Sequence, residues 1–518
     1  MIALPALRDR KIAVLGLARS GLVAAQALRA SGAQVLAWDD DAATCLAAAE
    51  KGVALTDLNA ADPAGWAALV MSPGIPLTHP APHPVAARAL AAGVPVIGDI
   101  ELLWQAGTGA RFLGITGTNG KSTTTSLIGH ILTQARHPVA IGGNLGTPVL
   151  SLPQLGADGT YVIEMSSYQL DLIAETRFAV AILLNVTPDH LDRHGDMAGY
   201  VAAKTRIFRN QTAGDTAIIG VDDDWCRAVA DELAQRPQPT QPSWPGLSRP
   251  STSSRDTVLE GQRQLPDVDP RDKPGDDGNW VGGETTAAAK VGATSRVIRI
   301  SIERAVPGGI YVLDGQLIDD TDGHARPVAD LGAIARLPGA HNWQNAAAAY
   351  AACRACGLDA ATIVAGLVSF AGLAHRQELV ATLGKVRFVN DSKATNAAAA
   401  AKALGCYDAI HWIAGGVAKA GGIEPLRPFF PRIRHAYLIG TAAKQFQETL
   451  GSTVKSSLSG DLPTAVRAAA NAASADPAEA PVVLLSPACA SFDQYRNFEI
   501  RGDAFRQIVR DLVAEAAR

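Results

Sequence analysis

The 518-residue sequence has few cysteines, few aromatic residues and little excess charge of either sign. Six cysteines scattered over so long a chain are typical of a cytosolic protein and argue against a disulfide framework. The formal net charge of −4 gives no reason to expect nucleic acid or an anionic membrane as a partner. No uncharged apolar run reaches the roughly 18 residues that a membrane span requires. The N-terminus also lacks a secretory signal pattern, so we expect a cytoplasmic protein without a membrane span.

Most of the chain alternates short apolar runs with helical patterns, which is typical of parallel sheets covered by helices. The pattern divides into three stretches, 1–99, 100–372 and 373–518, in agreement with about 100–200 residues per domain. We predict three consecutive α/β domains. The first and the last are expected to be Rossmann-like, and the central one to be of the P-loop type with a mostly parallel sheet.

One segment, 237–293, does not follow this pattern. Between Pro237 and Pro274 the chain has eight prolines, many serines and mixed charges, without the apolar period of a strand or a helix. Such a composition offers too little apolar surface to offset the entropy lost on ordering. We therefore predict a flexible insertion on the surface of the central domain.

The strongest motif runs from Gly114 to Ser122, GITGTNGKS, between a predicted strand and a predicted helix. Backbone N–H groups of such a loop and of the helix N-terminus can hold phosphate oxygens. Lys121 can neutralise phosphate charge, and the Ser122 hydroxyl can reach a magnesium ion. Ile115 stands where the strict Walker spacing has a glycine, which argues against an ordinary Walker ATPase but not against phosphate binding.

A weaker motif, Gly16 to Gly21, also follows a predicted strand and opens a predicted helix. Asp39 stands at the end of the next strand, which is the layout of a nucleotide-binding βαβ unit. Ala18 replaces the middle glycine of that pattern. On these residues alone the segment is a dinucleotide site, a mononucleotide site or only a tight turn.

Polar residues follow the predicted central strands. Glu164 ends one strand, and Asn185 ends the next, just before Thr187–Asp192. Ligands of open α/β sheets bind beyond the carboxyl ends of the strands, so Glu164 is well placed to bind magnesium through oxygen. Lys204 lies among small and apolar residues, and its composition alone predicts a surface lysine.

Several motifs occur in one order along the chain, and together they resemble the Mur ligase family. They are GTNGKST at 117–123, EMSSYQL at 164–170, NVTPDHLD at 185–192, AAKTRIF at 202–208, HNWQN at 341–345, AHR at 374–376, NDSKATN at 390–396, SPACASFDQYRNF at 486–498 and RG at 501–502. The resemblance covers nearly the whole chain apart from 237–293. It is nearest to the members of the family that add D-glutamate.

The resemblance implies an ATP-dependent ligase of peptidoglycan precursor synthesis that uses two Mg²⁺ ions. ATP would phosphorylate the carboxylate of UDP-N-acetylmuramoyl-L-alanine. The amine of D-glutamate would then displace phosphate from the resulting acyl phosphate. The family pattern also implies that Lys204 carries a carbamate, whose oxygens suit the second magnesium ion. We expect a monomer with no nucleic-acid partner.

The resemblance assigns roles to single residues. The ATP site would comprise Gly117, Thr118, Asn119, Gly120, Lys121, Ser122, Thr123, Asn345, Arg376 and Asp391. The UDP-substrate site would comprise Arg19, Ser20, Asp39, Ser72, Gly74, Asn144 and His190. The D-glutamate pocket would comprise Lys393, Thr395, Lys419, Ser491 and Phe498. The metal ligands would be Ser122, Glu164, His190 and carbamylated Lys204, and the catalytic residues Lys121, Glu164, His190 and Lys204. Arg19 and Ser20 depart from the residues that the family pattern leads us to expect.

Other interpretations are weighed against this one. The nearest is a different Mur-family enzyme, either folylpolyglutamate synthase-like or adding another amino acid, and the full first domain and 486–498 argue against it. A non-catalytic nucleotide-binding regulator would be expected to lose Lys121, Glu164 or Lys204, and all three are present. The interpretation as an NAD-dependent dehydrogenase depends on the motif from Gly16 to Gly21 alone, and this motif lacks the middle glycine.

Overall fold

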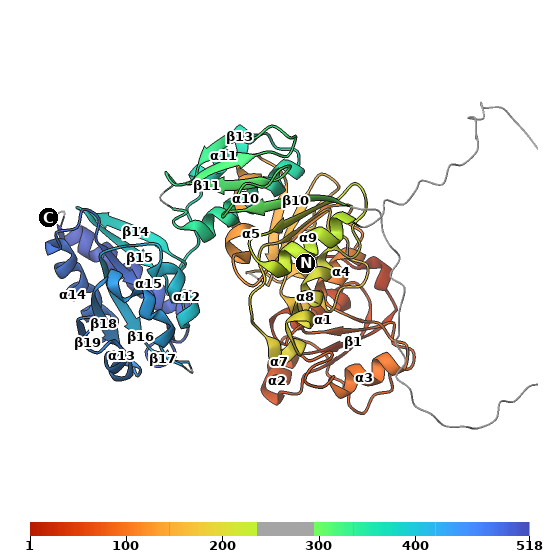
Figure 1. Ribbon diagram of the computed structural model, residues 1–518. Helices are drawn as coiled ribbons and strands as arrows, with labels where there is room; N and C mark the ends of the chain where they lie inside the picture. Colours follow the sequence, from red (N-terminus) through yellow and green to blue (C-terminus); the bar gives the residue numbers. More distant parts are fainter. Residues whose placement is uncertain (145, 236–294, 335, 420, 517–518) are drawn as a thin grey trace, which may run out of the picture.

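The computed structural model describes residues 1–144, 146–235, 295–334, 336–419 and 421–516. The predicted insertion, 237–293, lies outside these described residues. Three α/β units follow one another along the chain, and each is built on its own sheet (Figure 1). The third unit, drawn in blue, lies to one side of the other two. The prediction of three α/β units with mostly parallel sheets is confirmed.

The first sheet is parallel and has the strand order β2-β1-β3-β4. Its strands are β1 Lys11–Leu15, β2 Gln34–Trp38, β3 Ala68–Met71 and β4 Val96–Ile97. The helices between them are α1 Arg19–Ala30, α2 Ala42–Glu50 and α3 Pro84–Ala91. All residues of β3 are buried, and so are all residues of β1 except Lys11. This burial explains why both strands are continuously apolar apart from Lys11.

The central sheet has the strand order β13-β12-β11-β10-β9-β8-β5-β7-β6. Its strands are β5 Arg111–Thr116, β6 Val139–Gly143, β7 Thr160–Glu164, β8 Val180–Leu183, β9 Thr216–Gly220, β10 Arg296–Ser301, β11 Ile310–Leu313, β12 Gln316–Asp319 and β13 Arg326–Asp330. The pairings from β6 to β11 are parallel, whereas β12 pairs antiparallel with both neighbours. The sequence pattern does not predict β12 or β13, because QLID and RPVAD are short and largely half-exposed or exposed.

The helices of the central unit cover this sheet. They are α4 Asp99–Gln105, α5 Lys121–Gln134, α6 Ser167–Leu170, α7 Leu191–His194, α8 Met197–Thr205, α9 Asp224–Gln235, α10 Ala340–Ala355 and α11 Ala360–Ser369. Helix α10 packs against α5, and its alanines from Ala346 to Ala349 are fully buried. Because alanine side chains are small, α10 can approach α5 closely beside the phosphate loop.

The third sheet has the strand order β14-β15-β20-β16-β18-β19, in which only β14 is antiparallel to its neighbour. Its strands are β14 Glu378–Leu383, β15 Val386–Asn390, β16 Ile410–Gly415, β18 Ile433–Ile439, β19 Ser456–Gly460 and β20 Val482–Leu485. A separate antiparallel ribbon joins β17 Val417–Ala418 to β21 Cys489–Ala490. The helices of this unit are α12 Ala397–Leu404, α13 Ala443–Leu450, α14 Leu462–Ala475 and α15 Phe498–Ala516.

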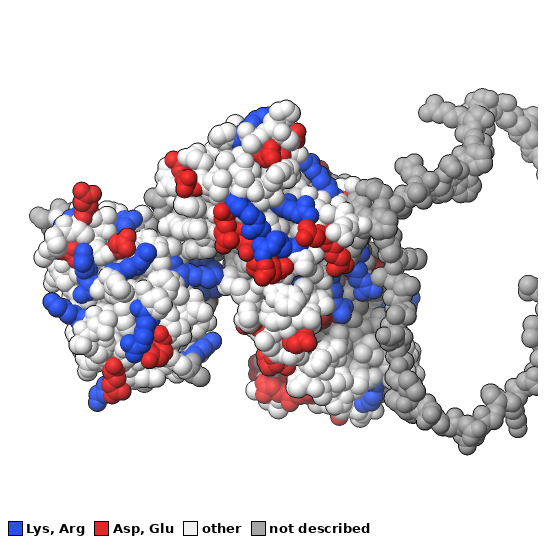
Figure 2. All heavy atoms as spheres, viewed as in Figure 1, with Lys and Arg blue, Asp and Glu red and all other residues white. Residues whose placement is uncertain are grey.

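The surface charges do not gather by sign on the face shown in Figure 2. Acidic and basic side chains are interspersed over the central and third units.

A buried carboxylate ties α4 to the segment that leads into β8. Glu101 is 0% exposed and accepts hydrogen bonds from the backbone N–H groups of Ala174, Glu175 and Thr176 at 2.9, 3.0 and 3.1 Å. The Thr176 hydroxyl donates a fourth bond at 2.6 Å. The carboxylate thus satisfies four donors at the junction between the first sheet and the central one.

We predict that Glu101→Ala destabilises the protein by about 3 kcal/mol or more, because it leaves buried N–H groups without an acceptor. Urea unfolding followed by circular dichroism would measure the change as a lower midpoint. The control is Glu50→Ala, which removes an exposed carboxylate from the end of α2. Equal midpoints for the two variants would show that the Glu101 carboxylate does not stabilise this junction.

Candidate functional site

The phosphate loop is the turn that connects β5 to α5. Gly117 and Gly120 have φ angles of +148° and +87°, in the region that L side chains rarely adopt. A Cβ atom at Gly120 would also overlap the side-chain oxygen of Asn345 on α10. Glycine at position 120 therefore allows both the turn and the close approach of α10.

Two asparagines hold this loop from neighbouring elements. Asn185, after β8, accepts the backbone N–H of Asn119 at 2.9 Å through Oδ1 and donates from Nδ2 to the Asn119 carbonyl at 3.2 Å. Asn345 accepts a bond from the Thr124 hydroxyl at 3.2 Å. These side chains fix the conformation of the loop while the N-terminus of α5 stays directed at the site.

Lys121 folds back over its own loop. Its ammonium group donates to the carbonyl oxygens of Gly117 at 2.7 Å and Thr118 at 2.9 Å. Burial lowers the pKa of Lys121 below its usual value, and the charge of Glu164 partly opposes this shift. Within the described part of the chain its hydrogen bonds go only to these two neutral oxygens, so the ammonium group can form a stronger bond with a phosphate.

Glu164 stands at the carboxyl end of β7 and is 2% exposed. Its Oε1 accepts a bond from Asn144 at 2.8 Å, whereas Oε2 is buried without a partner among the described residues. A buried carboxylate oxygen without a donor fits a hard cation such as magnesium. No three His, Cys, Asp or Glu side chains cluster in a metal-binding arrangement in the described part of the chain. A cation at Glu164 would therefore complete its shell with hydroxyl, phosphate or water oxygens.

Lys204 is only 1% exposed, so the surface location that its composition predicts is wrong. Its Nζ donates to the Gly117 carbonyl at 3.1 Å and lies 4.4 Å from the centre of the Tyr200 ring. Burial, followed by the positive charge of Lys121, lowers the pKa of Lys204 to about 7. A large fraction of this amine is thus uncharged at neutral pH, which a surface lysine would not be.

His190 lies nearby, at the start of α7, with a left-handed backbone of φ +53°. Its side chain is 47% exposed and lies 3.4 Å from the Asp189 carboxylate. The His190 ring centre is 5.1 Å from that of Tyr168. His190 is therefore the accessible member of the predicted catalytic set, while Glu164 and Lys204 are buried.

A cavity of about 610 Å³, which we call the first cavity, connects the first sheet to the phosphate loop. It is lined by all seven residues that the resemblance assigns to the UDP substrate: Arg19, Ser20, Asp39, Ser72, Gly74, Asn144 and His190. Lys121 and Lys204 line the same cavity. Ser72 donates from Oγ to the Gly16 carbonyl at 3.0 Å, and Asp39 accepts the Leu17 N–H at 2.6 Å. The structure thus brings the residues predicted for the UDP substrate and two of the predicted catalytic residues, Lys121 and Lys204, to one cavity.

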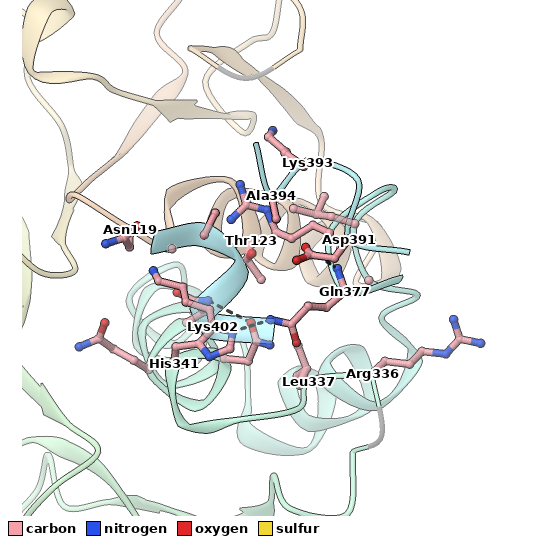
Figure 3. Close-up of a pocket in the computed structure, with 18 of the residues that line it drawn as sticks. Asn119, Thr123, Arg336, Leu337, His341, Gln377, Asp391, Lys393, Ala394 and Lys402 are labelled. Carbon is pink, nitrogen blue, oxygen red and sulfur yellow. Dashed lines mark hydrogen bonds between the residues drawn. The ribbon is translucent and has the colours of Figure 1, made fainter. Parts of the chain in front are cut away.

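A second cavity of about 230 Å³ also borders the loop (Figure 3). Its wall includes Asn119, Gly120, Thr123, Asn345, Arg376, Asp391, Lys393 and Lys402. The first four belong to the central unit and the last four to the third unit. The second cavity is therefore lined by residues of both units. The phosphate loop contributes to both cavities.

Asp391 and Arg376 face this second cavity from the third unit. Asp391 is 5% exposed and accepts the Ser486 hydroxyl at 2.8 Å and the Gln377 N–H at 3.2 Å. Burial raises the pKa of Asp391 to about 7, although the Ser486 hydrogen bond and the Arg376 charge favour its ionised form. The Nε of Arg376 is buried without a partner among the described residues. Both groups can therefore take a polar ligand.

The residues predicted for the D-glutamate pocket are spread over three segments of the third unit. Lys393 lines the second cavity, and its Nζ lies 5.6 Å from the centre of the Phe498 ring. Thr395 is half-buried and Ser491 is buried, whereas Lys419 is exposed at the end of β17. The structure does not gather all five into one cavity.

Three residues around the site have no role in the sequence prediction. They are Tyr200, which lies below Lys204, and Gln377 and Lys402, which line the second cavity. Lys402 is the one lysine in the alanine-rich helix α12. From the sequence, a single lysine in such a helix is expected to face solvent. No local pattern could have identified it, because the cavity forms between sheets that are distant in sequence.

The comparisons with known proteins agree with this geometry. A family model described as the Mur ligase middle domain matches residues 115–241. The UDP-N-acetylmuramoylalanine–D-glutamate ligase of Caulobacter vibrioides is 47% identical over 520 residues, covering 99% of this chain and 98% of that protein. The enzyme of the same name from Rhodospirillum rubrum is 49% identical over 506 residues, covering 97% and 94%. The chain belongs to the Mur ligase family.

Solved structures of other Mur ligases share the fold. The UDP-N-acetylmuramate–alanine ligase of Thermotoga maritima aligns over 97% of this chain and 99% of its own, at 14% identity and a TM-score of 0.52. A pseudomurein peptide ligase from Methanothermus fervidus gives 16% identity and a TM-score of 0.50, covering 97% of this chain and 100% of its own. Mur ligases use ATP and Mg²⁺, which suits the phosphate loop and Glu164. In the described part of this Mur ligase, no helix is long and apolar enough to cross a membrane.

We predict that Gly120→Ala raises the KM for ATP at least tenfold. The added methyl group would strain a left-handed backbone and collide with Asn345, which distorts the loop that holds phosphate. Steady-state kinetics at varied ATP would measure the effect. Gly214→Ala is the matched control, because Gly214 is exposed and its Cβ would meet no atom within 4 Å. Similar KM values for the two variants would contradict the role given to Gly120.

Proposed function

We infer that this Mur ligase adds D-glutamate to UDP-N-acetylmuramoyl-L-alanine at the expense of ATP, in the synthesis of peptidoglycan precursors. The similarity to D-glutamate ligases over nearly the whole chain supports this function. The observation that carries the mechanism is that two cavities meet at one phosphate loop. A carboxylate that enters from the first cavity would reach a nucleotide phosphate bound from the second.

The first step joins the two substrates at Lys121. A carboxylate oxygen of UDP-N-acetylmuramoyl-L-alanine attacks the γ-phosphorus of ATP, the bond to the β,γ-bridging oxygen breaks, and ADP leaves. Lys121 would neutralise the charge that develops between these anions, and the N–H groups at the start of α5 would bind phosphate oxygens. Magnesium, held by Glu164 and Ser122, would supply further positive charge to the phosphates.

The second step forms the amide bond. The amine of D-glutamate attacks the acyl carbon, a tetrahedral intermediate forms, and inorganic phosphate leaves with the acyl C–O bond broken. The amine must lose a proton, and the released phosphate is the simplest acceptor. We assign the D-glutamate carboxylates to Lys393 and Lys419 with the hydroxyls of Thr395 and Ser491, and the wall of the pocket to Phe498. Because Lys419 is exposed in this structure, it would become part of the pocket only when the substrate binds.

The organisation of the chain follows from this assignment. We propose that residues 1–99 bind the UDP part, 100–372 bind ATP, and 373–518 bind the amino acid. The substrates are ATP and a UDP-linked precursor, which are cytoplasmic metabolites, so the cytoplasm is the proposed location. Arg376 and Asp391 would bind the nucleotide from the third unit, and closure of that unit would keep water from the acyl phosphate.

The function is tested with purified protein, ATP, Mg²⁺ and UDP-N-acetylmuramoyl-L-alanine. Sustained phosphate release is expected only after D-glutamate is added, with the dipeptide product seen by mass spectrometry. L-Glutamate is the control for the D-configuration. Release that is independent of the amino acid, or that requires another one, would contradict the proposed function.

We also propose that Lys204 carries a carbamate. Its neutral amine would attack carbon dioxide, forming an N–C bond and releasing one proton to solvent. The lowered pKa favours the neutral amine, and the amine lies within hydrogen-bond distance of the Gly117 carbonyl in the phosphate loop. The oxygens of a carbamate there would suit a second magnesium ion. Since the pKa is about 7, the neutral fraction rises as the pH increases through 7 and falls below it.

We predict that Lys204→Ala lowers turnover at least a hundredfold, and that millimolar acetate or formate restores part of it by replacing the carbamate oxygens. Lys51→Ala, which removes an exposed lysine, is the control. Carbon-13 NMR of wild-type protein with labelled carbon dioxide should show a carbamate signal that Lys204→Ala lacks. An active Lys204→Ala enzyme, or the same carbamate signal in both proteins, would refute the modification.

A further inference from the structure

Lys402 enters the second cavity from α12, a helix that packs mainly on the third sheet and on the 3-10 helix Glu424–Arg432. Helix α12 buries Ala400, Ala403 and Leu404 against that sheet. Lys402 points the other way and lines the cavity that also contains Gly120 of the phosphate loop. Figure 3 shows it beside His341, which belongs to α10 of the central unit. Its side chain therefore lies where the central and third units face each other.

No carboxylate of the described residues pairs with the ammonium group of Lys402. In the part of the chain that the structure describes, its Nζ makes neither a hydrogen bond nor an ion pair. Asp391 is the one carboxylate among the described residues that line the cavity, and it already accepts bonds from Ser486 and Gln377. Three other lysines that line the two cavities each have a contact: Lys121 and Lys204 bond to carbonyl groups, and Lys393 lies near the Phe498 ring.

The neighbours of Lys402 make this charge unfavourable. Burial, and then the charges of Arg376 and Lys121, lower the pKa of Lys402 to about 8. Burial and the Lys402 charge lower the pKa of His341 to about 4, so that imidazole is neutral at pH 7. A cation that is partly desolvated and surrounded by other cations is stabilised by an anion that enters the cavity. A purely structural lysine would instead be expected to pair with an acid or to extend into solvent.

We propose that Lys402 is a nucleotide-binding residue that donates a hydrogen bond to a phosphate oxygen of ATP from the third unit. This inference rests on the proposed function, because it assigns the anion to the nucleotide of that reaction. It adds a third contact from the C-terminal part of the chain to those of Arg376 and Asp391. The nucleotide phosphates would then be held between Lys121 on the central unit and Lys402 on the third.

The test is calorimetric binding of ATP, ADP, AMP and adenosine, with Mg²⁺ and without the other substrates, to wild type and to Lys402→Met. Methionine keeps the apolar stem and removes the charge. We expect a ten- to hundredfold weaker affinity for ATP, the range of one charged hydrogen bond, and an unchanged affinity for adenosine. Lys402→Arg should recover most of the ATP affinity. Lys444→Met, on the exposed face of α13, is the matched control and should bind ATP like wild type.

Kinetics supply a second readout. In Lys402→Met the KM for ATP should rise while the KM values for D-glutamate and the UDP substrate stay within twofold of wild type. If Lys402→Met melts at a lower temperature than wild type, Lys402→Gln is measured in the same way. Equal ATP affinities in wild type and the charge-removing variant overturn the proposal, and so does an equal loss for adenosine and ATP. A wild type that binds ATP but forms no D-glutamate product would instead contradict the proposed function.

Discussion

The turn from β5 into α5 is the constraint on which the rest of the site depends. Gly117 and Gly120 adopt backbone angles that other residues rarely take, and this lets a strand pass directly into a helix whose first N–H groups stay free. Asn185 and Asn345 hold the loop from β8 and α10, so its shape does not depend on a bound ligand. Phosphate binding thus meets a preformed site rather than a loop that must first be ordered.

Charge is distributed unevenly between the surface and the interior. The chain as a whole carries a net charge of −4, yet lysines and arginines line the two cavities at the phosphate loop. Burial lowers the pKa values of Lys204 and Lys402, because a cation loses hydration there, and neighbouring positive charges lower them further. The substrates of the proposed reaction are anions, so binding would remove this repulsion. The positive charges that repel one another in the two cavities would make these cavities selective for anionic ligands.

Each of the two cavities is lined by residues from two of the three units. The first cavity joins the first sheet to the loop, and its lining already contains every residue predicted for the UDP substrate. The second cavity needs Asn345 from the central unit and Arg376 and Lys402 from the third. Nucleotide binding in the second cavity would therefore couple the position of the third unit to the phosphate loop. A D-glutamate pocket that extends to exposed Lys419 fits a third unit that completes the site as the substrates bind.

The sequence by itself determined the elements whose signals are local. The alternation of strands and helices predicts the three α/β units, and the glycine loop before Lys121 predicts the phosphate site, because turn residues and apolar periods act over a few neighbours. The family resemblance added the UDP-substrate residues, which the structure brings to one cavity. The short strands β12 and β13 escaped prediction because their stability comes from pairing and not from their own pattern.

Tertiary structure alone decided which polar groups are buried and which lack partners. Lys204 and Lys402 both have the sequence signature of surface lysines, yet one is 1% exposed and the other lines a cavity. The sequence likewise gives no sign that Oε2 of Glu164 is buried without a partner among the described residues. Burial and hydrogen bonding depend on segments hundreds of residues apart, such as the loop at Gly120 and helix α12, and their approach is set by the packing of whole sheets.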